Sequence, residues 1–139
     1  RAHGPTPIAC CIARSNPGAG IYAVYATQIP DCASSENPGH GIQAGGEGNR
    51  VVGNTCRGNG LAGIHVPNLR SGNRIEGNNV TANSIGIDID GDENIIIANT
   101  ANANTTNYSI GAGNAYGGII NVAGAGAFAS DQPWANLAY

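Results

Sequence analysis

The chain contains no lysine and no methionine, and charged residues make up only 11% of its 139 residues. With six arginines and a formal net charge of −3, it lacks the clustered basic face that nucleic-acid binding requires. Strong helix formers other than alanine are scarce, which argues against a helical bundle. No apolar run approaches the roughly 18 residues of a membrane span. We therefore expect a single domain with neither nucleic acid nor membrane as partner.

What the chain has in abundance is glycine and asparagine in a repeating pattern. A Gly-Ile pair recurs at Gly20-Ile21, Gly41-Ile42, Gly63-Ile64, Gly86-Ile87 and Gly118-Ile119. A second repeated motif begins and ends with asparagine, at residues 49–54, 73–78 and 94–99. When the three copies of this motif are aligned, Val51, Ile75 and Ile96 share one column, and their neighbours include arginine and glutamate. This alternation of apolar and polar residues predicts short strands.

A repeat of this length with short strands predicts a parallel β-helix. A leucine-rich repeat would need a leucine ladder, and a coiled coil would need heptads; the sequence has neither. Glycine and asparagine suit sharp corners because they tolerate left-handed backbone angles. The aligned isoleucines would stack inside, and the asparagines at Asn49/Asn73/Asn94 and Asn54/Asn78/Asn99 would form ladders along the axis. We expect an all-β fold of about five to six short coils.

The phrases GNRVVGNTCRGNGLAGIHV and SGNRIEGNNVTANSIGID make the resemblance specific. They resemble the right-handed parallel β-helix repeat proteins of bacteria, a group that includes pectate-lyase-like and NosD-like modules. The similarity covers roughly residues 39–139. It implies the fold but little about activity, because this fold hosts lyases, hydrolases, epimerases, adhesins and structural modules.

Within one domain of residues 1–139, we expect three parts. Residues 1–19 would be an irregular N-terminal segment, 20–122 the coils and 123–139 a C-terminal capping tail. The stretch 98–117 lengthens one repeat and is expected to protrude as a loop. Phe128, Trp134 and Tyr139 would fold under the last coil as a plug. The N-terminal edge would stay bare, available for pairing with another subunit.

The only acidic cluster lies in GIDIDGDEN, residues 86–94. With Ile87 and Ile89 inward, Asp88 and Asp90 point outward on one face. Together with Asp92 and Glu93 they are candidate calcium ligands, and the resemblance implies calcium with arginine in pectate-lyase-like enzymes. The alternative is a solvated acidic corner without a cofactor, which is favoured because calcium needs six or more oxygens.

Gly39-His40-Gly41 resembles the Gly-His-Gly motif of polygalacturonases. His40, Asp88 and Asp90 are therefore the candidate catalytic residues. However, the aspartate-bearing motifs expected before this motif are absent, and Gly41 is also a regular corner glycine of the repeat. We therefore favour the absence of a catalytic residue, and we expect His65 to face outward into solvent.

The four cysteines show no metal-binding spacing. Cys11 and Cys32 occupy equivalent repeat positions, so they should lie on adjacent coils within disulfide range. Cys56 lies 24 residues after Cys32 and would compete for it, while Cys10 points to the opposite face. The alternative is four reduced, buried thiols. Disulfides are favoured because the scarcity of charge suggests an exported chain.

Three sequons, at Asn79, Asn104 and Asn107, are candidate glycosylation sites, although such triplets also arise by chance in an Asn/Thr-rich chain. Tyr22 and Tyr25 are candidates for stacking on sugars. The chain begins at Arg1, which suggests a processed chain or a fragment.

Two functions remain. The favoured one is a secreted or cell-surface structural β-helix, non-enzymatic, that self-associates end to end into a filament, sheath or appendage. The alternative is a module that binds or cleaves acidic polysaccharide, with His40, Asp88, Asp90 and Asp92 as its site.

Overall fold

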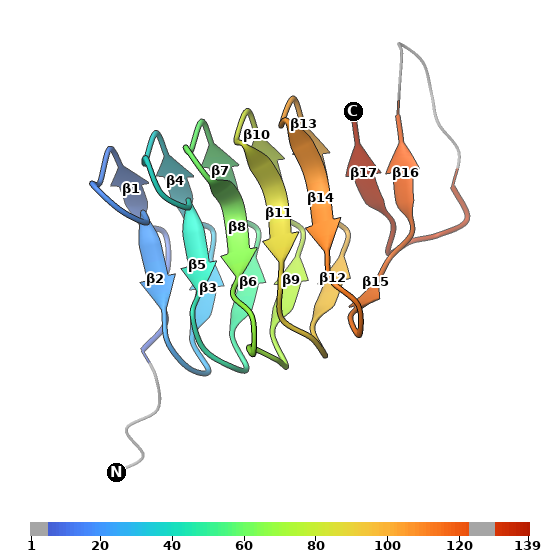
Figure 1. The fold of residues 1–139 in the computed structure, drawn as a ribbon, viewed down its shortest axis with the longest axis horizontal. Helices are drawn as coiled ribbons and strands as arrows, with labels where there is room; N and C mark the ends of the chain where they lie inside the picture. The colour runs from blue at the N-terminus through green and yellow to red at the C-terminus, as the bar shows by residue number, and fades with distance from the viewer. Residues whose placement is uncertain (1–5, 123–129) are drawn as a thin grey trace.

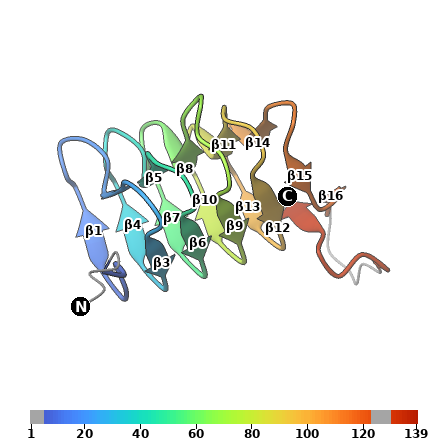
Figure 2. The ribbon, with the colours of Figure 1, turned by 90° about the horizontal axis from the view of Figure 1, so that it is seen from below.

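The computed structural model describes residues 6–122 and 130–139 and contains 17 strands. All of their pairings are parallel, and they form three sheets that wind as a solenoid of about six turns (Figures 1 and 2). No helix in the described part of the chain is long and apolar enough to cross a membrane. The all-β parallel solenoid predicted from the repeat is confirmed.

Sheet A has seven strands, in the order β1 (Ile12–Arg14), β4 (Ala33–Ser35), β7 (Thr55–Arg57), β10 (Asn79–Thr81), β13 (Thr100–Asn102), β17 (Asn136–Ala138) and β16 (Ile119–Asn121). Sheet B has five strands, β2 (Ile21–Ala23), β5 (Ile42–Ala44), β8 (Ala62–Val66), β11 (Ile85–Ile89) and β14 (Thr106–Ile110). Sheet C has five strands, β3 (Gln28–Pro30), β6 (Arg50–Val52), β9 (Arg74–Glu76), β12 (Ile95–Ile97) and β15 (Ala115–Tyr116).

The interior is built from columns of like residues. Ile21, Ile42, Ile64 and Ile87 pair in register across sheet B and are at most 6% exposed. Val51, Ile75 and Ile96 form a second column in sheet C, and all three are fully buried. Both columns confirm the stacking predicted from the sequence.

The predicted isoleucine column is wrong at its last member. Tyr108, not Ile119, pairs with Ile87, while Ile119 lies in β16 of sheet A and is 40% exposed. The long interval between Gly86 and Gly118 therefore contains an additional complete coil, in which Asn107-Tyr108 takes the place of Gly-Ile. For the same reason residues 98–117 do not protrude as a loop, because they form β13, β14 and β15.

Asparagine ladders line the corners between the sheets. In each ladder the backbone N–H and the side-chain Nδ2 of one asparagine donate to Oδ1 of the asparagine one coil further on, at 2.8–3.1 Å. The two predicted ladders are confirmed, and they extend to Asn114 and Asn136. A third, unpredicted ladder consists of Asn16, Asn37, Asn59, Asn83 and Asn104. The ladders pair polar groups that the corners would otherwise bury without a partner.

The two ends of the solenoid differ. At the first coil, the N–H groups of Ile8 and Cys10 donate to Gln28 and Pro30 carbonyls and so cover the edge of sheet C. At the other end Tyr108 packs against the core, and its single hydroxyl hydrogen is within reach of the carbonyls of Asn99 (2.9 Å) and Leu137 (2.8 Å).

The aromatic plug predicted for the tail is therefore wrong where it can be checked. Trp134 and Tyr139 are 57% and 54% exposed, and Phe128 lies outside the described residues. The predicted boundaries also shift, since residues 1–19 include β1 and residues 123–139 include β17. Strand β17 lies between β13 and β16 (Figure 1), so the later strand occupies the inner position.

Candidate functional site: a histidine–aspartate cluster on sheet B

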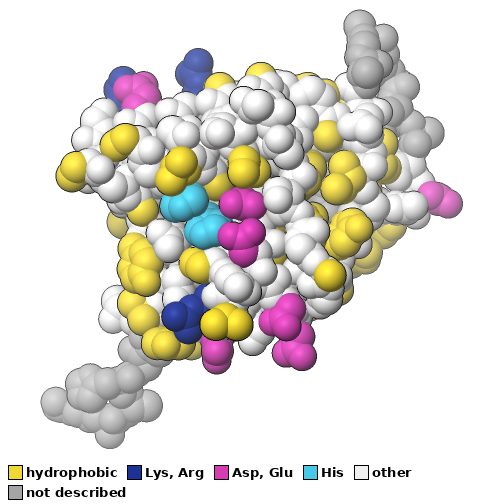
Figure 3. Space-filling view, in the orientation of Figure 1, with side chains coloured by type: hydrophobic (Ala, Val, Ile, Leu, Met, Phe, Trp, Pro, Cys, Tyr) yellow, Lys and Arg dark blue, Asp and Glu magenta, His cyan; other side chains and the backbone are white. Residues whose placement is uncertain are grey.

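Parallel register places a row of polar side chains on the outer face of sheet B. Gln43, His65, Asp88 and Ser109 pair in that order across β5, β8, β11 and β14. Ile64, Ile87 and Ile89 on either side of this row point inward and are buried. Figure 3 shows the two described histidines beside two acidic side chains near the middle of this face. The structure thus brings together residues from different repeats.

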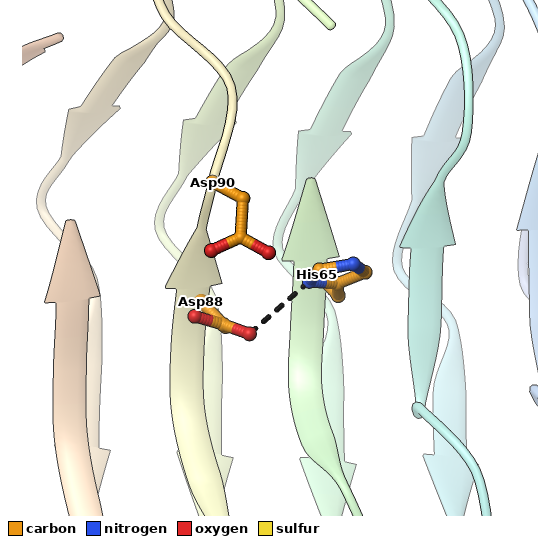
Figure 4. A group of neighbouring side chains, drawn as sticks. All are labelled: His65, Asp88 and Asp90. Atoms are coloured by element: carbon orange, nitrogen blue, oxygen red, sulfur yellow. Dashed lines mark ion pairs between the residues drawn. The ribbon is translucent and has the colours of Figure 1, made fainter. Parts of the chain in front are cut away.

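His65, Asp88 and Asp90 converge (Figure 4). His65 Nδ1 lies 3.2 Å from Asp88 Oδ2, and these side chains are only 11% and 14% exposed. Nδ1 itself is buried and makes no well-aligned hydrogen bond, although the carboxylate lies close to it. One potential ligand atom from each of the three residues lies within 4.8 Å of the other two. Asp90 is the exposed member and leaves the cluster open on one side.

His40 covers His65. The two imidazole rings stack with centroids 4.2 Å apart and planes inclined by 7°. His40 Nδ1 accepts the Ala62 N–H at 3.3 Å. Burial, and then the neighbouring His65, lower the pKa of His40, so it stays neutral at pH 7. The prediction that His65 points outward is correct, but its side chain is covered instead of solvated.

The electrostatics of the cluster keep Asp88 ionised. The pKa of Asp88 lies below its usual value, first because the His65 imidazole faces it, although burial partly opposes this effect. Ser109, in register on β14, also faces the carboxylate and lowers its pKa. An ionised carboxylate beside a buried imidazole nitrogen is an arrangement suited to binding a cation.

The four acidic residues predicted as calcium ligands do not converge. Asp92 and Glu93 are exposed at the next corner and stand apart from the cluster that Asp88 and Asp90 form with His65. Calcium takes six to eight oxygen ligands. Two carboxylates and an imidazole nitrogen do not fit that requirement.

The cluster also does not match an inverting glycosidase. Such enzymes separate their two carboxyl groups by roughly 6.5–9.5 Å to admit a water molecule, whereas ligand oxygens of Asp88 and Asp90 lie within 4.8 Å of each other. His40, the third candidate catalytic residue, stacks on His65, and the backbone already occupies its Nδ1.

All four cysteines are free thiols in the structure, Cys10 and Cys11 exposed and Cys32 and Cys56 buried. Cys56 pairs in register with Ser34, so the predicted competition for Cys32 is wrong. Cys11 is the in-register neighbour, and its N–H donates to Cys32 Sγ at 3.3 Å. Burial raises the pKa of the Cys32 and Cys56 thiols, which keeps both protonated at neutral pH.

The candidate glycosylation sites differ in access. Asn79 is exposed on β10. Asn104 belongs to the third ladder, and its Nδ2 donates to Val80 O and Asn107 Oδ1, both at 3.0 Å. A glycan on Asn104 would replace one Nδ2 hydrogen and so break one of these bonds, whereas the exposed Asn79 carries no such constraint.

A second feature, which the sequence reasoning missed, lies on sheet C. Tyr116 and Trp134 line a shallow cavity of about 470 Å³ together with Arg74, Ile95 and Ile97. We call it the aromatic groove. Gly117 permits the close approach of Trp134, because a Cβ at Gly117 would overlap the Trp134 carbonyl oxygen. Tyr22 and Tyr25, the tyrosines singled out from the sequence, are exposed but do not line this groove.

Comparisons with known proteins bear on the fold alone. No curated protein and no solved structure shows significant similarity to the chain. A family model described as a right-handed beta helix region matches residues 6–132. That match spans most of the chain and agrees with the parallel, stacked sheets, so the chain belongs to the right-handed β-helix family.

Proposed function

We propose that the protein is an extracellular, non-enzymatic structural solenoid whose coils continue from one copy into the next. The observation that carries this proposal is the pair of open strand edges at the first coil. Strands β1 and β2 end sheets A and B, with no further strand beyond them among the described residues, and β14 ends sheet B at the opposite end. Open edges of this kind are templates for pairing with another chain.

The backbone of β2 is oriented for such pairing. Ile21 N–H donates to Gly41 O at 2.9 Å, and Ala23 O accepts from Gly45 N–H at 2.8 Å, so the residues flanking Tyr22 bond inward to β5. The N–H and C=O of Tyr22 therefore point to the open edge, because successive residues of a strand bond on opposite sides. A second copy whose β14 lies against β2 would extend sheet B without changing its parallel direction.

The experiment blocks this edge without disturbing the fold. Tyr22→Pro removes the outward N–H but leaves the inward bonds of Ile21 and Ala23 intact, because proline is tolerated on edge strands. Tyr22→Ala is the matched control, since it loses the same side chain and keeps the N–H. We expect sedimentation velocity and electron microscopy to show rods for wild type and Tyr22→Ala and monomers for Tyr22→Pro. Monomeric wild type at every concentration would refute the proposal.

The aromatic groove favours a second function, binding of an acidic polysaccharide. Tyr116 and Trp134 present exposed aromatic faces, which provide large apolar contact area. Arg74 lies in the same groove, and a guanidinium pairs well with a carboxylate. Part of that charge already pairs with Glu76, whose Oε2 lies 2.7 Å from Arg74 Nε.

Affinity electrophoresis with polygalacturonate and a neutral glucan tests this second function. We expect Trp134→Ala to abolish retardation by polygalacturonate, and Arg74→Gln to weaken it while retardation by the neutral glucan stays unchanged. Tyr22→Ala, which removes an equally exposed tyrosine outside the groove, is the control. Equal retardation of wild type and Trp134→Ala would remove the groove as a sugar site.

A further inference from the structure

The His65–Asp88–Asp90 cluster contains an unsatisfied donor-acceptor atom. Nδ1 of His65 is buried, points to the two carboxylates and has no well-aligned hydrogen-bond partner. A buried polar atom without a partner destabilises a fold unless a ligand pairs with it. The inward residues of β8, among them Ile64 and Val66, fill the interior, so the core does not require a histidine at position 65.

The surroundings hold the three ligand atoms in place. His65 and Asp88 stand in register on adjacent strands, and Asp90 follows Asp88 on the same outer face. Ser109 faces Asp88 from the next strand, as groups that orient a ligating carboxylate do. His40 accepts the Ala62 N–H through Nδ1, so its neutral ring carries a proton on Nε2 and serves as a cover instead of a ligand.

We propose that His65 Nδ1 and the carboxylates of Asp88 and Asp90 bind one divalent transition-metal ion of the zinc class. One imidazole nitrogen and two carboxylate oxygens are ligands that such ions accept, and two negative charges balance the ion. Three protein ligands leave at least one coordination position for water on the side that the exposed Asp90 leaves open. The proposal is independent of self-association and of the aromatic groove, and it replaces calcium with an ion that tolerates nitrogen.

Isothermal titration of the metal-free protein with zinc chloride tests the site. Cys10 and Cys11 are exposed thiols that also bind zinc, so the titration uses a Cys10→Ser/Cys11→Ser background. We expect one zinc ion per chain, with affinity reduced at least about tenfold in Asp90→Asn and in His65→Gln. Asp92→Asn is the matched control, because it makes the same charge change at an exposed aspartate outside the cluster.

Replacement of zinc by cobalt provides a spectroscopic signal that a misfolded protein would not give. Bound Co²⁺ should give visible absorption in the background protein and in Asp92→Asn but not in His65→Gln, with circular dichroism showing that all variants are folded. Saturable one-to-one binding that calcium does not displace supports the proposal. Absence of saturable zinc binding, an equal loss of affinity in Asp92→Asn, or displacement by equimolar calcium would overturn it.

Discussion

At the corner between sheets C and A, the central coils and the coils that flank them use different residues. Immediately before the asparagines of the ladder at this corner, the central coils place glycine in the left-handed region, at Gly53 (φ 67°) and Gly77 (φ 63°). The coils on either side place Asp31 (φ 54°) and Ala98 (φ 54°) at the equivalent positions. The left-handed angle is thus constant along the solenoid whereas glycine is not. The hydrogen-bonded ladder, and not the glycine, defines the corner, and non-glycine corners are held in place at a cost in strain.

The ladder itself is also stronger in the centre. Asn78 accepts two bonds from Asn54, at 2.9 and 3.0 Å, and donates to Val51 O and Asn99 Oδ1. On the first coil, Asn16 only donates to Asn37. Two of the three columns begin with Thr27 or Cys32 in place of asparagine. A gradient of stability from the centre to the first coil follows.

The largest expected effect comes from removing a central ladder residue. Asn78→Ala removes the acceptor of the buried Asn54 N–H and the bonds that Asn78 Nδ2 donates to Val51 O and Asn99 Oδ1. We expect a loss of about 3–5 kcal/mol in the free energy of unfolding, since each buried unpaired group costs about 1–3 kcal/mol. Asn16→Ala should cost only about 1 kcal/mol. Urea unfolding of both variants measures the difference. Equal losses would show that the ladder contributes uniformly along the axis.

An intermediate effect is expected at one corner in two neighbouring coils. Gly77→Ala should destabilise the protein by about 1–2 kcal/mol, because alanine is strained at positive φ. No atom lies within 4 Å of the added Cβ, so strain is the only cost. Ala98→Gly, at the equivalent corner, should change stability by less than about 1 kcal/mol in the stabilising direction, because relief of strain exceeds the added chain entropy. Thermal unfolding that moves both variants in the same direction would contradict this account.

The smallest effect is expected from the surface ion pairs. Arg74 lowers the pKa of Glu76, so this pair stabilises the fold above the unfolded-state pKa of Glu76 and is lost as pH falls through its lower folded-state value. Glu76→Gln should cost less than about 0.5 kcal/mol at pH 7 and nothing at pH 2. Glu36→Gln, which breaks the more exposed pair with Arg14 on the end coils, should cost still less. Salt titrations of both variants check the assignment, since screening should remove the difference.

The sequence predicts the central coils well because their signal is local and periodic. The columns of Val51, Ile75 and Ile96 and two asparagine ladders follow directly from alignment. The third ladder has the same spacing at Asn59, Asn83 and Asn104. Its flanking residues vary, so alignment of the repeats does not reveal it. The contact between His65 and Asp88 can also be predicted from the sequence, because each residue follows an aligned isoleucine. The contact becomes visible only when the two repeats are read together, because neither residue alone indicates it.

The end coils were predicted poorly for a physical reason. Tyr108 replaces the expected isoleucine, and period counting then skips a whole coil. The aromatic groove depends on β17 entering sheet A beside β13, which brings Trp134 against Gly117 and Tyr116. That insertion is a long-range pairing that no repeated sequence pattern predicts. Likewise, the stacking of His40 on His65 depends on side-chain orientation, which spacing does not determine.

The position of β17 also sets an order of events during synthesis. Every coil up to β15 can add to the one before it as the polypeptide leaves the ribosome. Strand β16 has only β17 as its hydrogen-bonded neighbour, so it must wait until residues 136–138 have been made. Growth of the solenoid is therefore sequential until its final step. In that step β17 must pair with β13 before the earlier strand β16 can join the sheet.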